Sequence, residues 1–207
     1  MDVFTGEERE LFKRLNTPQK IQDFIESIPI NFEPNGDTCL SPRMVLRERR
    51  AHCIEGAILA AMILRYHGYQ PLLVDLETTK DDFDHVIAVF KQHGHWGAIS
   101  KTNHAVLRYR EPAYKTIREL VMSYFHEYFK NETGKKTLRG FTKPINLKMF
   151  DEKEWMTSQE EVWYIAEHLA DAPHVPLISK EQIKTLRRAT EVERRLGTIV
   201  EWEKKNE

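Results

Sequence analysis

An apolar stretch that follows a basic turn constrains the fold of this chain more than any other feature. Residues 53–66 read CIEGAILAAMILRY, directly after Arg49 and Arg50, and Gly68 follows where a helix C-cap is expected. The stretch predicts a helix buried among other elements, because apolar residues cover almost its whole surface. Cys53 is the first residue of this helix. Its thiol would lie at the positive end of the helix dipole, which lowers the pKa of a cysteine and favours the thiolate.

The region after this helix is rich in residues that favour β-strands and contains turn residues at short intervals. It predicts four strands, at residues 70–76, 85–90, 96–100 and 105–109. The second and third strands would form a hairpin, because the short turn from Gln92 to His95 separates them. If this turn is centred on His93 and Gly94, residue 85 faces residue 102. Side chains alternate along a strand, so residue 100 would then share the face of residue 85.

Helical patterns flank this region on both sides. They predict helices at residues 5–15, 17–27 and 41–48 before it, and at residues 114–129, 158–169 and 179–202 after it. The expected fold class is therefore α+β, with the Cys53 helix packed on an antiparallel sheet and extra helices at both ends. We expect residues 1–130 to form the core and residues 131–207 to form a C-terminal helical extension packed on it.

The net charge of the chain argues against highly charged partners such as nucleic acids and anionic membranes. Lys and Arg total 31 and Asp and Glu total 32, so the net charge is −1 and neither nucleic acid nor a membrane is an expected partner. No apolar run approaches the length of a membrane span, and residues 1–9 lack the apolar stretch of a signal peptide. These features predict a cytoplasmic protein and leave its oligomeric state open.

The chain has two cysteines, Cys39 and Cys53. A disulfide between them is not expected in a reducing cytosol, and a single pair does not make a disulfide framework. Cys39 lies in a turn-like segment, and we interpret it as a bystander.

The order of these elements resembles the transglutaminase-like superfamily, which belongs to the papain-like cysteine enzymes. The resemblance covers roughly Thr17 to Tyr128, with a cysteine at a helix start, a histidine in the β-rich run FDHVIAVF, a hairpin and a returning strand. It implies a papain-like core in which Cys53 is the nucleophile and His85 is the general base. It also implies attack on an amide or peptide carbonyl, through a thioester that ends in hydrolysis or acyl transfer. The substrate would be a peptide or an amide-bearing small molecule, and no cofactor is implied.

The third member of the expected triad departs from the family pattern. The family places an Asp where this chain has Ser100, and strand parity also puts Ser100 beside His85. A serine can hydrogen-bond an imidazole but cannot offset the charge of an imidazolium. Asn103 is the alternative, because an Asn orients the histidine in papain itself, although parity argues against it. The serine also motivates a second function, in which a weak or inactive member binds a partner through the same cleft.

Further histidines surround the expected site in the sequence. His52 stands directly before Cys53, and we interpret it as a loop residue that could narrow the pocket or tune the thiolate. His93, His95 and His104 raise the question of a zinc site. No metal is expected, because these residues form no ligand pair at helical spacing and the chain has no CxxC motif.

Overall fold

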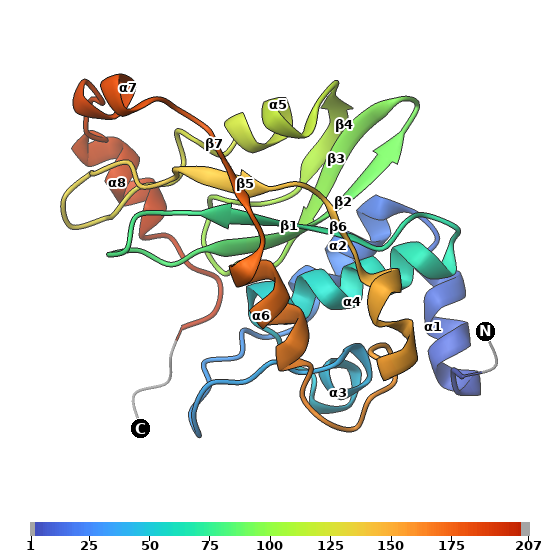
Figure 1. The fold of residues 1–207 in the computed structure, drawn as a ribbon. Coiled ribbons are helices and arrows are strands. Elements are labelled where there is room, and N and C mark those ends of the chain that lie inside the picture. Colours follow the sequence, from blue (N-terminus) through green and yellow to red (C-terminus); the bar gives the residue numbers. More distant parts are fainter. Residues whose placement is uncertain (1–2, 204–207) are drawn as a thin grey trace.

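A computed structural model describes residues 3–203; residues 1–2 and 204–207, at the outer ends of the two expected regions, lie outside the described part of the chain. The described residues form an α+β structure around one sheet, in which every paired strand is antiparallel to its neighbour (Figure 1). The strand order is β4-β3-β2-β1-β5-β7, and β6 also pairs with β1. This arrangement confirms the predicted fold class and the antiparallel sheet.

The bounds of the elements follow from the backbone. The strands are β1 (Leu72–Glu77), β2 (His85–Gln92), β3 (His95–Ser100), β4 (Arg110–Tyr114), β5 (Gly140–Thr142), β6 (Ile145–Asn146) and β7 (His174–Pro176). The helices are α1 (Gly6–Arg14), α2 (Pro18–Ser27), α3 (Pro42–Glu48), α4 (Cys53–Tyr66), α5 (Ile117–Met122), the 3-10 helix η1 (Leu147–Lys153), α6 (Trp163–Asp171), α7 (Lys180–Lys184) and α8 (Glu191–Gly197). Figure 1 shows α4 and α5 on opposite faces of the sheet, with α1, α2, α3 and α6 on the α4 side.

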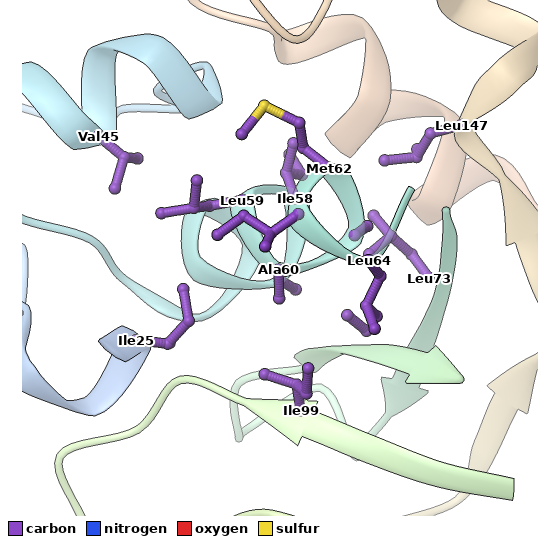
Figure 2. Packing of buried hydrophobic residues seen from close by; sticks show 14 of the residues in the cluster. Ile25, Val45, Ile58, Leu59, Ala60, Met62, Leu64, Leu73, Ile99 and Leu147 are labelled. Carbon is purple, nitrogen blue, oxygen red and sulfur yellow. The ribbon is translucent and has the colours of Figure 1, made fainter. Parts of the chain in front are cut away.

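Helix α4 is the buried helix that the apolar stretch predicts. Figure 2 shows its side chains surrounded by Val45 of α3, Ile25 of α2, Ile99 of β3 and Leu73 of β1. Ten consecutive residues of the helix, 55–64, are buried. Each large apolar side chain buried in this way contributes on the order of 1.5–3 kcal/mol. Helix α4 therefore makes a large contribution to packing the surrounding helices on this face of the sheet. Gly68 follows the helix with a φ of +87°, a left-handed conformation that suits glycine.

The β2–β3 hairpin has the register that the sequence predicts. His93 and Gly94 form its two-residue turn, with φ angles of +49° and +81°. Two positive φ angles are typical of the tight turns whose twist matches a hairpin. Ile87 therefore pairs with Ser100. Since His85 lies two residues before Ile87, it shares a face of the sheet with Ser100.

The fourth strand lies further along the chain than predicted. Residues 105–109 form a loop, and the strand is β4 instead. Pro112 lies inside this strand, which is possible because β4 is at the edge of the sheet and needs no donor on its outer side. The expected helix at residues 114–129 is shorter at both ends. It starts later, as α5, because β4 runs to Tyr114, and it ends at Met122, where residues 123–127 form turns.

The C-terminal part contributes strands as well as helices, which corrects the expectation of a helical extension. Strands β5 and β6 pair with β1, and β7 pairs with β5. The expected helix at residues 179–202 is two short helices, α7 and α8. The break lies where Ala189 donates its N–H to the Gly134 carbonyl and the Glu193 carboxylate caps the N–H of Thr190, which starts the second helix. Within residues 3–203, no helix has both the length and the apolar character of a membrane span.

Candidate functional site

A cleft of about 700 Å³ opens at the N-terminal end of α4. Its wall includes Cys53, His52 and His85, and its rim includes the loop before β2 and the loop after β3. Cys53 is partly exposed to this cleft, whereas His85 is 6% exposed. The fold thus brings together two of the residues that the sequence singles out, from a helix end and a strand start that are more than thirty residues apart.

A buried carboxylate holds the first turn of α4 in place. Glu55 is fully buried, and its oxygens accept hydrogen bonds from the main-chain N–H groups of Leu40 and His52, both at 2.9 Å. The Thr38 hydroxyl and the Asn31 amide also donate to it, at 2.8 Å and 3.1 Å. Four donors compensate the cost of burying this charge. The network determines the direction in which α4 begins, and so where Cys53 points.

Two histidine rings act on the Cys53 thiol. His52 and His85 line the same cleft as Cys53, and both favour its thiolate form. Burial alone raises the pKa of this thiol, but the hydrogen bonds and positive charges of the two rings outweigh burial and lower the pKa to about 5. Cys53 is also the first residue of α4, where the N–H groups of the first turn favour an anion. The arrangement favours a thiolate at neutral pH.

His52 is part of the site and not only a loop residue. Its Nε2 lies 2.9 Å from the Thr38 carbonyl oxygen and 3.4 Å from the Glu33 carboxylate. A carbonyl oxygen can only accept, so this nitrogen carries a proton. Burial lowers the pKa of His52, but the Cys53 sulfur and the charge of Glu55 raise it to about 9. His52 is therefore positively charged beside the thiolate at neutral pH.

His85 is bonded to Ser100, as strand parity predicts. The His85 Nε2 lies 2.8 Å from the Ser100 Oγ, and this Oγ lies 2.5 Å from the Leu107 carbonyl oxygen. Ser100 is fully buried. Since Nε2 is bonded to the serine, the other ring nitrogen, Nδ1, is the one that can exchange a proton with Cys53.

Two residues that the sequence analysis did not identify fix the end of β3 against the helices. The Gln22 side chain of α2 donates to the Ser100 carbonyl and accepts from the Ser100 N–H, both at 2.9 Å, as a neighbouring strand would. The buried stem of Lys101 packs on Gly56 in the first turn of α4. A Cβ at position 56 would lie 2.4 Å from the Lys101 Cβ, so only glycine allows this approach. Both contacts set the position of Ser100 relative to Cys53.

The alternative third residue points elsewhere. Asn103 lines the cleft, but its amide donates to the Trp202 carbonyl at 3.1 Å, and no hydrogen bond to His85 is present among the described residues. His104 bonds to the Gly197 carbonyl, and His95 bonds to the His93 carbonyl in the hairpin turn. Across residues 3–203, no group of three or more His, Cys, Asp or Glu side chains is arranged to hold a metal ion.

The residues missed by sequence reasoning left only weak signals. Glu55 stands three positions after the N-cap residue, where a carboxylate can bond back to the helix start. Gln22 lies within an otherwise apolar helix face and so is a buried polar residue in need of partners. No protein-family model matches this chain, and a search of curated protein sequences finds no match to it.

Proposed function

We propose that this protein is a transglutaminase-like cysteine enzyme with a papain-like core, which acts on an amide or peptide carbonyl through a thioester. Cys53 is the nucleophile, His85 is the general acid–base, and Ser100 orients His85. The observation that carries the proposal is the position of Cys53 at a helix start, in the wall of a cleft that His52 and His85 also line. The order of helix, strand and hairpin, which resembles that superfamily, supports it.

The open cleft favours an enzyme over a protein that only binds. A blocked cleft or a histidine ring turned away from the sulfur would favour the binding role. Here the cleft has a volume of about 700 Å³ and Cys53 and His85 both line it. The polarised thiol is a further argument, because a binding surface has no need of a reactive cysteine.

The first half of the reaction forms the thioester. The Cys53 thiolate attacks the carbonyl carbon, and the electron pair of the C=O bond moves onto its oxygen. The N–H of Cys53, one of the first-turn groups without a partner inside the helix, is placed to donate to this oxyanion. The C–N bond then breaks, and His85 gives its Nδ1 proton to the leaving amine. The products are a free amine and an acyl group on the Cys53 sulfur.

The second half releases the acyl group. The neutral Nδ1 of His85 takes a proton from a water molecule or from an incoming amine, whose oxygen or nitrogen attacks the thioester carbon. The C–S bond breaks, and the sulfur leaves as a thiolate beside the protonated rings. Water yields a carboxylic acid, and an amine yields a new amide. His52 stays charged throughout and stabilises the thiolate in both halves.

A test of the proposal is to trap the acyl group on Cys53. The protein is mixed with p-nitrophenyl acetate, and its intact mass and peptide masses are measured. We expect one acetyl group on Cys53, released by hydroxylamine, and none in Cys53→Ala. Dimethylated casein with a fluorescent primary amine then separates hydrolysis from acyl transfer. If iodoacetamide labels Cys53 but no acyl adduct forms, the binding function replaces the enzymatic one.

A further inference from the structure

The hydroxyl of Ser100 lies between two groups that compete for its single proton. One is the His85 Nε2 at 2.8 Å, and the other is the Leu107 carbonyl oxygen at 2.5 Å. Ser100 is 0% exposed and His85 is 6% exposed, so bulk water cannot take the place of either partner. Each of the two hydrogen bonds therefore needs its donor and its acceptor from among these three groups.

Counting protons leaves one arrangement. A carbonyl oxygen has no proton and can only accept, so the contact with Leu107 requires the serine to donate. The serine has one proton and therefore cannot also donate to His85. The Ser100 Oγ still has lone pairs, so it accepts a hydrogen bond from the imidazole. His85 must then carry a proton on Nε2 whether the ring is neutral or charged.

The Leu107 carbonyl is held in place and cannot readily turn away. Leu107 has a φ of +60°, a left-handed conformation that a leucine rarely adopts without support from its surroundings. Its N–H donates to the Glu127 carboxylate at 2.9 Å, and this carboxylate is paired with Arg110 at 2.7 Å. Gln22 holds the main chain of Ser100, which carries the hydroxyl. The backbone at Leu107 and the backbone at Ser100 are thus each anchored by a side chain from another segment.

We propose that Ser100 and the Leu107 carbonyl act as a positioning pair that keeps the His85 proton on Nε2 and presents Nδ1 to Cys53. The role rests on the proposed function, in which Nδ1 exchanges a proton with the sulfur and the substrate. The serine thereby selects the productive tautomer without carrying a charge. A carboxylate at position 100 would orient the ring as well, but it has no proton for the Leu107 oxygen.

The tautomer can be read directly by nuclear magnetic resonance. Cys53→Ala is labelled with nitrogen-15, so that the sulfur no longer influences Nδ1, and long-range proton–nitrogen correlations are recorded at a pH where the His85 ring is neutral. The His85 signals are those that disappear in Cys53→Ala/His85→Gln. We expect the proton on Nε2 and an unprotonated Nδ1. A proton on Nδ1, or a mixture of the two tautomers, would overturn the proposal.

Substitutions at position 100 test the functional consequence in the chain with Cys53 present. Ser100→Ala should lower the rate of Cys53 alkylation below neutral pH by roughly tenfold, because the ring loses its orienting bond. Ser100→Thr should restore much of the rate, since it keeps the hydroxyl. Ser27→Ala is the matched control, because the Ser27 hydroxyl also donates to a main-chain carbonyl, that of Phe24 at 2.7 Å, on the exposed end of α2.

Ser100→Asp separates this pair from an ordinary carboxylate triad. The aspartate would place an unprotonated oxygen against the Leu107 carbonyl, so we expect slower alkylation than in the unmodified protein. Faster alkylation would overturn the role of Leu107. The tautomer does not depend on turnover. A proton on Nε2 in a protein that forms no acyl adduct would therefore leave the positioning pair intact and remove only the proposed function.

Discussion

The two cysteines lie fourteen residues apart, yet the regions around them have opposite effects on a thiol. The Cys39 side chain is fully buried, and burial together with the negative charge of Glu55 raises its pKa to about 12. Cys53 is the first residue of α4, and the effects of His52 and His85 outweigh burial and bring its pKa down to about 5. Burial by itself therefore does not decide the reactivity of a cysteine, because positively charged donors near the sulfur can outweigh it.

Glu55 belongs to both regions and acts on them in opposite directions. Its charge disfavours a second anion at Cys39, and it favours the protonated form of His52. Through His52 it supports the thiolate at Cys53. The same buried carboxylate thus widens the difference between the two thiols while it anchors the start of the helix.

The largest effect expected is the loss of thiol reactivity in Cys53→Ala. Iodoacetamide should label the unmodified protein at one site below neutral pH, because only Cys53 is a thiolate there. Cys39→Ala should keep the labelling and Cys53→Ala should lose it, as measured by the mass of the modified peptides. Equal labelling of both cysteines would break the comparison between the two regions.

The next effect is that both histidines are needed for the low pKa of Cys53. We expect His52→Ala and His85→Ala each to raise the thiol pKa by roughly 1–3 units, since each removes a donor and a positive charge. The double variant should approach the ordinary cysteine value of about 8.5. The ultraviolet absorbance of the thiolate, followed against pH, measures the shift. A single variant that already reaches the ordinary value would assign the effect to that histidine alone.

Replacing Glu55 should weaken the fold. Glu55→Ala leaves the N–H groups of Leu40 and His52 without an acceptor, and we expect a loss of about 3 kcal/mol or more in the free energy of unfolding. Glu55→Gln is the matched control, because it keeps the shape and one acceptor oxygen, and it should cost less. Chemical denaturation followed by circular dichroism gives both values. If the alanine variant is as stable as the glutamine variant, the network is not the anchor of α4.

The smallest effect is the pH dependence of the ion pair between Cys53 and His52. The lowered pKa of Cys53 means that its contribution to stability is present above the ordinary thiol pKa and is lost as the pH falls through about 5. The raised pKa of His52 means that its contribution is present below the ordinary histidine pKa and is lost as the pH rises through about 9. Both charges therefore coexist between these values.

The alkylation rate of Cys53 should accordingly rise as the pH increases through about 5 and change again near pH 9. His52→Gln should remove the second change and keep the first at a higher pH. A rate profile with a single midpoint near the ordinary thiol pKa would show that neither histidine lowers the pKa of Cys53.

Local sequence patterns predicted the parts of the fold that depend on neighbouring residues. The run at residues 53–66 predicted α4 because its composition suits a buried helix, and His93 with Gly94 predicted the hairpin turn and hence the register of Ser100. The prediction of the fourth strand at residues 105–109 is wrong because Pro112 favours a strand only at the edge of a sheet, which is where β4 lies. Whether a strand lies at an edge depends on the order of all strands in the sheet, which no local pattern contains.

The residues of the candidate site also fall into two groups, those that local patterns predict and those that only the tertiary structure brings in. Cys53 and His85 stand out in the sequence because a helix start and a strand start each have a local signature, and strand alternation places Ser100 beside His85. The partners of these residues come from other segments: Thr38 faces His52, Gln22 of α2 holds Ser100, and the Leu107 carbonyl accepts the hydrogen bond of the serine. Such contacts arise only when the loops close around the sheet. The order of amino acids thus decides which groups can react, and tertiary packing decides their protonation, because pKa values and tautomers depend on donors brought together from remote parts of the chain.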